Sequence, residues 1–152
     1  MQEINKATHA ILGNEDNIIT ANDGMDISVC SIKKDITNDG QWLLKFSGAN
    51  HSCIIVRGDE VIQTAYNHTG ISLLTPIDYG FTETTYPIEK GDCIYLFTDG
   101  YPDQFGGSTI EIRNAGGKKF KYKQLIELLK SNKDKNVFEQ RLHLLDSIKS
   151  WM

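Results

Sequence analysis

The spacing of apolar residues changes twice along this chain, and that change limits the possible folds more than any other feature. In several segments between residues 25 and 88 apolar side chains recur at every second position, which is typical of strands, and a polar loop at residues 66–80 interrupts them. Residues 2–12 and 120–152 repeat them at three- to four-residue intervals, which is typical of amphipathic helices. An α+β fold of mostly antiparallel strands, flanked by helices, is therefore expected.

Tight turns separate the expected strands. The segments "MDISVCSI" and "QWLLKFSGAN" are joined across Asn-Asp-Gly at residues 38–40, which is a hairpin signal. The segments "SCIIV" and "EVIQTA" flank Arg-Gly-Asp at residues 57–59, a second tight turn. These four strands are expected to follow one another as an antiparallel meander.

The segment "CIYLF" at residues 93–97 is an unbroken apolar run. It is apolar on both faces, which is the pattern of a central strand covered on both sides. The alternating segment "FTETTYPI" precedes it, and a polar, glycine-containing loop follows at residues 99–118. The sequence therefore predicts that residues 93–97 form the core strand.

Two helices are expected after this loop, and one before the strands. In the last helix Asn136 and Glu139 have the spacing of a capping box. The expected apolar stripe of that helix is Phe138, Leu142, Leu145, Ile148 and Met152. The expected apolar face of the first helix is Ile4, Ala7, Thr8 and Ile11.

The whole of residues 1–152 is expected to be one partial domain. The first helix starts at Met1 without a cap and the last stripe runs to Met152 without a stop signal, so both ends are expected to be cut from something longer. The expected parts are a helix end at 1–13, antiparallel sheets at 25–98, a loop at 99–118 and a helical part at 120–152.

Charge and cysteine content exclude some classes of function. The formal net charge of −4 gives no broad attraction for nucleic acid or anionic lipid. Cys30, Cys53 and Cys93 lie in apolar segments without metal-ligand spacing, which favours free thiols in a reducing compartment. No segment approaches the roughly 18 apolar residues of a membrane span. A cytoplasmic protein without nucleic-acid or membrane partners is expected.

One carboxylate stands where the predicted core strand ends. Asp99 and Gly100 follow "CIYLF" after a single threonine, and Asp103 and more glycines come soon after. Oxygen ligands on such a loop suit a hard divalent cation, and glycine lets a phosphate or water approach closely. A plain turn explains the same residues, so both interpretations stay open at this point.

The wider context resembles a known family. The segments "GDCIYLFTDGYPDQFGG", "GKKFKYKQLIELL" and "LLKFSGANHSCIIVRGDEVIQ" resemble the SpoIIE-like and RsbU-like branch of the PPM (type 2C) metal-dependent protein serine/threonine phosphatases. The likeness runs residue by residue from Gly91 to Gly100 and covers nearly the whole chain. It implies a layered α/β/β/α sandwich, incomplete here, and it implies that Asp99 is a metal ligand.

The resemblance also implies a reaction and a partner. Family members hold two Mg²⁺ or Mn²⁺ ions that activate a water for attack on phosphoserine or phosphothreonine. The implied substrate is a phosphorylated bacterial regulatory protein in signal transduction. The family's earlier Asp-Gly motif and its final pair of aspartates have no counterpart in this chain. Little or no activity is therefore expected from the chain as given, and no catalytic residue is assigned.

Other polar residues have weaker patterns. Asp23 reads as a turn residue, Asp103 as a solvated loop carboxylate, and each has metal ligation as its alternative. Asp26 has no partner visible in the sequence. His51 reads as a turn or surface histidine, with general acid as the alternative.

Two further sets of polar residues are candidates for a site. Three histidines lack ligand-like spacing: His9, His68 and His143. A basic run reads as a solvated helix entrance, with contact to a phosphorylated partner as its alternative: Lys118, Lys119, Lys121 and Lys123.

Three interpretations of the whole chain remain open. The first is part of a phosphatase domain, the second is a non-catalytic module that keeps the sandwich as a binding surface, and the third is an unrelated antiparallel sheet with terminal helices. A sandwich that lacks terminal strands leaves unpaired edges, so a dimer or a swapped assembly through exposed sheet edges is also expected.

Overall fold

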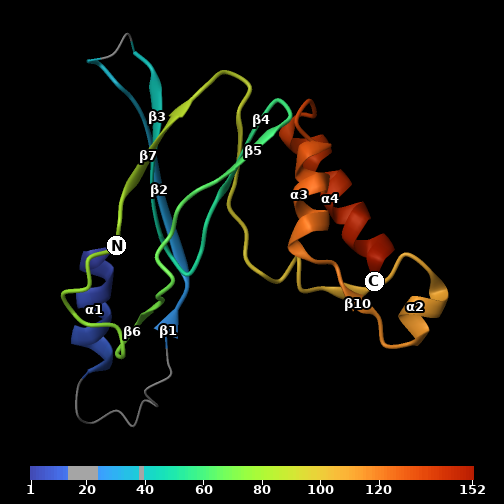
Figure 1. Ribbon diagram of the computed structural model, residues 1–152, viewed down its shortest axis with the longest axis horizontal. Helices are drawn as coiled ribbons and strands as arrows, with labels where there is room; N and C mark the ends of the chain where they lie inside the picture. The colour runs from blue at the N-terminus through green and yellow to red at the C-terminus, as the bar shows by residue number, and fades with distance from the viewer. Residues whose placement is uncertain (14–23, 38–39) are drawn as a thin grey trace. The chain divides into compact units, whose positions relative to one another are not determined.

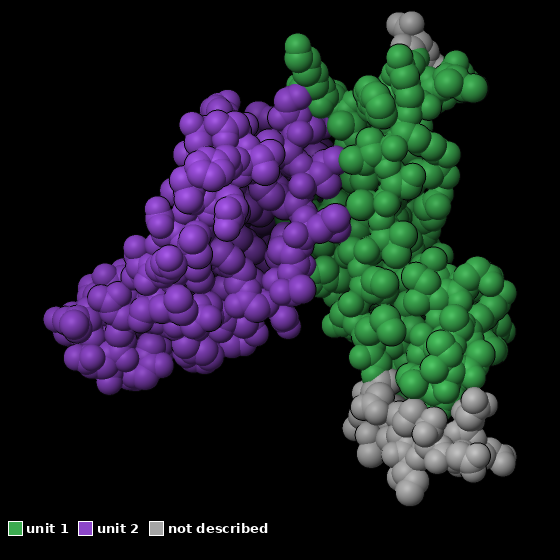
Figure 2. Space-filling view, turned by 180° about the vertical axis from the view of Figure 1, so that it is seen from behind, with its two compact units in different colours: residues 1–54, 63–90 green, residues 55–62, 91–152 purple. Residues whose placement is uncertain are grey.

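The computed structural model describes residues 1–13, 24–37 and 40–152 and contains both helices and strands (Figure 1). The chain divides into two compact units (Figure 2). Unit 1 consists of residues 1–54 and 63–90, and unit 2 of residues 55–62 and 91–152. Within the described ranges no helix has the length and apolarity that crossing a bilayer requires.

Unit 1 is built around a three-stranded antiparallel sheet in the order β2-β3-β7. The β2–β3 pairing runs from Ile27 opposite Ala49 to Lys34 opposite Trp42, which confirms the first predicted hairpin, although turn residues 38 and 39 lie outside the described residues. The elements are α1 (Gln2–Leu12), β1 (Gly24–Met25), β2 (Ile27–Lys34), β3 (Trp42–Ala49), β6 (Ile71–Ser72) and β7 (Thr84–Ile88).

The middle strand of this sheet carries the core of unit 1. Leu44 and Phe46 on β3 are almost fully buried, whereas Trp42 on the same face is 52% exposed near the end of the strand. Burial of such side chains contributes about 1.5–3 kcal/mol each. The predicted face is therefore confirmed for two of its three residues.

Helix α1 spans the predicted residues and ends before Gly13, but its buried face is polar. Asn5 and Thr8 are buried, whereas Ala7 is exposed and Ile11 is 67% exposed, so the predicted apolar face is wrong at Ala7 and Ile11. The reason is that α1 lies against backbone carbonyls that need donors. The Asn5 amide donates to the Pro76 carbonyl (2.8 Å), and His9 Nε2 lies 2.7 Å from the Thr75 carbonyl oxygen.

Unit 2 contains a second three-stranded sheet, in the order β5-β4-β8, and three helices. The predicted turn at residues 57–59 is confirmed, because Gly58 adopts a φ of 54° between β4 and β5. The elements are β4 (Ile54–Arg57), β5 (Glu60–Gln63), β8 (Cys93–Tyr95), β9 (Phe105–Gly106), α2 (Ile110–Asn114), β10 (Lys118–Lys119), α3 (Tyr122–Lys130) and α4 (Val137–Trp151).

The prediction of one four-stranded meander is wrong, because β2 and β3 belong to one sheet and β4 and β5 to another. The chain leaves the first sheet at the "SGANH" turn. Asn50 has a φ of 53°, and its N–H donates to the Asn67 carbonyl (2.8 Å). A Cβ at Gly48 would stand 2.0 Å from the His51 carbonyl oxygen, so this turn requires glycine there.

Strand β8 is shorter and less buried than predicted. It spans only Cys93–Tyr95, all half-buried, and Leu96 is 51% exposed. Among the described strands β4 is its one neighbour, so β8 is not a central strand and the prediction is wrong. A strand that is covered on one face can have the same apolar composition as a strand that is covered on both faces. Composition therefore could not show that β8 is only half-buried. The deepest strands are β3 and β4 instead.

Residues 99–118, predicted as a loop, contain a short helix and a strand pair. Thr109 caps α2 by accepting the N–H of Ile112 (3.4 Å), and β9 pairs with β10 in antiparallel orientation. Helix α2 is five residues long, too short for a periodic pattern to reveal.

The capping box of α4 is confirmed. Asn136 Oδ1 accepts the N–H of Glu139 (3.0 Å), and Glu139 Oε2 accepts the N–H of Asn136 (3.0 Å). The predicted core stripe of α4 is wrong, because four of its five residues are exposed: Phe138 64%, Leu142 42%, Leu145 39% and Met152 56%. The half-buried residues of α4 are Gln140, His143, Leu144, Ser147, Ile148 and Trp151.

Removal of the cap should destabilise unit 2 measurably. Asn136→Ala leaves the N–H of Glu139 without its side-chain acceptor, and we expect a loss of about 1 kcal/mol in the free energy of unfolding. Urea denaturation followed by circular dichroism measures it. Gln124→Ala on the exposed side of α3 is the matched control and should be close to neutral; equal losses in both variants would contradict the role of the cap.

Candidate functional site

The carboxylate of Asp99 is exposed at the start of a turn that follows β8. The strand ends at Tyr95, three residues pass without regular structure, and the Asp99 carbonyl then accepts the N–H of Asp103 (2.9 Å). The backbone is thus tied into a turn while the side chain faces solvent. This arrangement suits an open ligand position, and the role of Asp99 as a metal ligand stays a prediction.

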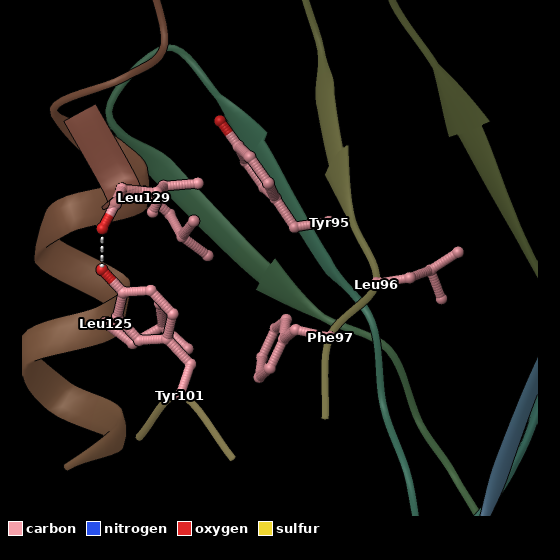
Figure 3. A pocket seen from close by; sticks show the side chains of 7 residues that line it. Tyr95, Leu96, Phe97, Tyr101, Leu125 and Leu129 are labelled. Carbon is pink, nitrogen blue, oxygen red and sulfur yellow. Dashed lines mark hydrogen bonds between the residues drawn. The ribbon is translucent and has the colours of Figure 1, made fainter. Parts of the chain in front are cut away.

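The segment 99–107, here called the Asp99 loop, is held by hydrogen bonds along its length. The Tyr101 hydroxyl donates to the Leu144 carbonyl (2.7 Å), an interaction drawn as a dashed line in Figure 3. The Pro102 carbonyl accepts the N–H of Lys121 (2.7 Å), and the Gln104 carbonyl accepts the N–H of Phe120 (2.9 Å). Burial raises the pKa of Tyr101, so its hydroxyl remains a donor at neutral pH.

The end of α4 closes the other side of this loop. Trp151 donates from Nε1 to the Gln104 carbonyl (3.1 Å), and its own carbonyl accepts the N–H of Gly107 (2.7 Å). The rings of Tyr101, Phe120 and Trp151 meet edge to face, with centroids 5.4 Å apart in both pairs. Such pairs contribute about 0.5–1.5 kcal/mol each beyond the area that they bury.

Gly106 leaves the space that this closure needs. A Cβ at Gly106 would stand 1.9 Å from the Trp151 carbonyl oxygen and 2.7 Å from a carbon of its ring. Gly106→Ala should therefore displace Trp151 and cost at least about 1–3 kcal/mol in the free energy of unfolding. Urea denaturation followed by tryptophan fluorescence measures both effects. Gly100→Ala is the control, because a Cβ there meets only Thr98 Oγ1 at an ordinary 3.5 Å; an unchanged Gly106→Ala protein would contradict the packing described.

A cavity of about 100 Å³ lies beside the loop within unit 2 (Figure 3). In Figure 3 the side chains of Tyr95, Phe97 and Tyr101 point toward α3, and Leu96 points the other way. The Tyr95 hydroxyl donates to Gln140 Oε1 (3.0 Å), and burial raises the pKa of Tyr95. Both tyrosine hydroxyls are thus engaged, so the cavity offers hydrophobic contact and no metal ligand. Its lining residues are Tyr95, Leu96, Phe97, Tyr101, Leu125, Leu129 and Leu144.

The described residues do not make a complete metal site. Nowhere in the described part of the chain do three His, Cys, Asp or Glu side chains come together as ligands of one ion. Asp103 is exposed and pairs with Lys119 Nζ (2.7 Å), which agrees with a solvated loop carboxylate. The donor set at the Asp99 loop is therefore one hard oxygen ligand, short of what a bound ion of this class needs.

The remaining acidic candidates lie in unit 1 or outside the described residues. Asp23 is outside them. Asp26 is exposed and accepts a hydrogen bond from Asn50 Nδ2 (3.0 Å), so the view that it lacks a partner is wrong. His51 is half-buried directly after the left-handed Asn50, in agreement with a turn histidine.

The other histidines and the basic run have ordinary surroundings. His143 Nδ1 lies 2.6 Å from Asn132 Oδ1, and the ring of His68 contacts that of Tyr66 in a tilted arrangement with centroids 4.5 Å apart. Phe120, between the lysines, is buried, whereas all four lysines are exposed. The basic run thus fits a solvated helix entrance.

An ion pair that the sequence analysis missed fixes the start of β8. Arg57 donates from Nε to Asp92 Oδ1 (3.0 Å) and from Nη2 to Asp92 Oδ2 (2.7 Å). The Asp92 side chain is 1% exposed and that of Arg57 is 23% exposed. This bidentate contact joins the end of β4 to the residue before β8, and so it sets the register of the strand that leads to Asp99. Knowledge that β4 and β8 are neighbours would have been needed to find it.

Comparisons with known proteins give a family and a fold. A family model described as "Stage II sporulation protein E (SpoIIE)" matches residues 1–151. Among solved structures, the chain is similar to one described as "SiaA-PP2C domain of Pseudomonas aeruginosa", with a TM-score of 0.72 and 21% sequence identity over 98% of this chain. The match spans 51% of that chain, about half its length. No curated protein matches.

Proposed function

Because this chain belongs to the stage II sporulation protein E (SpoIIE) family, we propose that it forms part of a metal-dependent protein serine/threonine phosphatase domain. The fold is that of a PPM-type, phosphatase-like domain, of which the chain matches about half in the SiaA-PP2C structure. The single observation that carries the proposal is the match over residues 1–151, and the exposed Asp99 in the turn that follows β8 supports it.

The proposed reaction is hydrolysis of phosphoserine or phosphothreonine on a bacterial regulatory protein in the cytoplasm, as a step of signal transduction. The proposed cofactor is Mn²⁺ or Mg²⁺, which in such enzymes supplies an activated water. Asp99 is the residue of this chain that would hold the ion. Because the described residues offer no further ligand cluster, no step of the reaction is assigned to them, and we expect little or no turnover from the 152-residue chain by itself.

A non-catalytic binding module is the alternative function. The observation in its favour is that the described residues bring no three potential ligands together. Such a module would keep the fold and bind a phosphorylated regulatory protein without hydrolysing it.

An activity assay separates the two proposals. The 152-residue chain, and any in-frame extension of it that the genome encodes, are supplied with manganese and given peptides that carry phosphoserine, phosphothreonine or phosphotyrosine. The phosphatase proposal expects release of phosphate from the first two peptides by the extended protein. Absence of turnover from both proteins, together with retained binding of a phosphopeptide, would establish the binding module instead.

A further inference from the structure

Helix α4 has apolar residues on its packed side and also beyond it, on its exposed surface. At 100° per residue, the half-buried Leu144 and Trp151 lie on the side of α4 that packs against the rest of unit 2. Four exposed side chains lie about 120° further around the helix and form a row here called the outer stripe: Phe138, Leu142, Leu145 and Met152. A helix whose inner side is already packed does not need this row for its own fold.

The spacing of the outer stripe is that of a helix–helix seam. Its members follow one another at intervals of four, three and seven residues, and exposed Lys149 occupies the position between the last two. These intervals are those of the core positions of a heptad repeat. Exposed apolar side chains that line up in this way mark an interaction surface more often than scattered ones do.

The charges beside the outer stripe differ between its two flanks. Arg141 lies on one flank, and Glu139 and Asp146 lie on the other. Neither Arg141 nor Asp146 has an ion-pair partner in the part of the chain that the structure describes.

The charges on the two flanks attract those of a second, identical helix in only one orientation of the pair. When two copies of α4 lie parallel around a two-fold axis, the basic flank of each faces the acidic flank of the other, and Arg141 comes near Asp146 of the second copy, five residues further along. In an antiparallel pair each flank faces its own kind, so like charges meet. Charge complementarity therefore favours a parallel pair of identical helices.

We propose that the outer stripe of α4 is a homodimer interface in which two copies of the chain pair through parallel helices. Lys149 at a core position fixes the register at some cost in stability. The seam is 15 residues long, about 22 Å, so the interface is small and the dimer depends on concentration. The proposal is independent of the phosphatase activity, and its surface differs from the sheet edges through which the sequence predicts pairing.

The oligomeric state of the full chain tests the surface. Sedimentation velocity over about 10 to 200 μM should show a monomer–dimer equilibrium for the unchanged protein, with a Kd in that range. The double variant Leu142→Glu with Leu145→Glu should raise Kd more than about 100-fold and sediment as a monomer. Ile36→Glu is the matched control, because Ile36 is 91% exposed in unit 1 and should leave Kd unchanged. Circular dichroism checks that each variant is folded.

A charge exchange tests the orientation without loss of apolar surface. Arg141→Glu alone and Asp146→Arg alone should each raise Kd about tenfold, because each puts like charges together in the parallel pair. An equimolar mixture of these two variants should form a heterodimer, since both of its flank contacts are then attractive. A monomeric unchanged protein would overturn the proposal, and so would a dimer that survives the double glutamate variant or a mixture that fails to pair.

Discussion

In the active extended protein, Asp99→Asn is expected to lower manganese-dependent phosphatase turnover by more than about 100-fold. Loss of a residue that merely orients a metal ligand already costs about 10- to 100-fold in affinity or activity, and loss of the ligand's own charge should cost more. The substitution keeps the size of the side chain, and the turn at residue 99 depends on its backbone carbonyl rather than on the carboxylate. The fold should therefore be unchanged, as circular dichroism would show.

The matched control for this substitution is Asp103→Asn. Asp103 lies in the same turn, is half exposed and pairs with Lys119 on the surface, so its loss should change turnover by less than about twofold. Manganese binding, measured by electron paramagnetic resonance, gives a second readout that does not depend on substrate. Equal turnover and equal manganese affinity in both variants would show that Asp99 is not a metal ligand.

Asp92→Ala is expected to destabilise the protein by about 3 kcal/mol or more. The carboxylate of Asp92 is 1% exposed and accepts two hydrogen bonds from Arg57, whose side chain is 23% exposed. Removal of one partner of a largely buried pair leaves the other charge desolvated without its counter-ion, which typically costs about 3–5 kcal/mol. The free energy of unfolding in urea measures the loss.

Two further variants test the cause. Arg57→Lys keeps the charge but cannot make the two-pronged contact, so it should also destabilise the protein, although less than Asp92→Ala does. Asp59→Ala is the control, because Asp59 is 91% exposed and its contact with Lys133 lies at the surface, so little change is expected. If Asp92→Ala unfolds at the same urea concentration as Asp59→Ala, the pair does not set the register of β8.

Local signals in the sequence predicted local structure well. The capping box of Asn136 and Glu139 and the turn at Gly58 depend on residues within a few positions of one another, and both are confirmed. The stretch from Gly91 to Gly100 likewise gave the family, which the match over residues 1–151 confirms. All of these patterns can be recognised without knowing which elements lie side by side.

Contacts between residues that are far apart in the sequence could not be predicted. The division of the strands into two sheets depends on Asn50 meeting Asn67, and the start of β8 depends on Arg57 meeting Asp92, 35 positions away. Periodicity on α4 located an apolar row correctly but not the side of the helix that packs, because the apolar residues of that helix extend around it beyond the packed side. The sequence thus identified Asp99 as a candidate without showing what surrounds it.

The hydrogen bonds between Trp151 and the Asp99 loop can form only late in the synthesis of this part of the chain. Gln104 leaves the ribosome 47 residues before Trp151 does, an interval of about 2 to 9 seconds at ordinary translation rates. Through that interval the carbonyl of Gln104 can accept only the N–H of Phe120, and the N–H of Gly107 lacks the Trp151 carbonyl. The Asp99 loop therefore gains the hydrogen bonds that Trp151 makes to residues 104 and 107 only after Trp151 has emerged, whereas the turn at Asp99 itself can close much earlier.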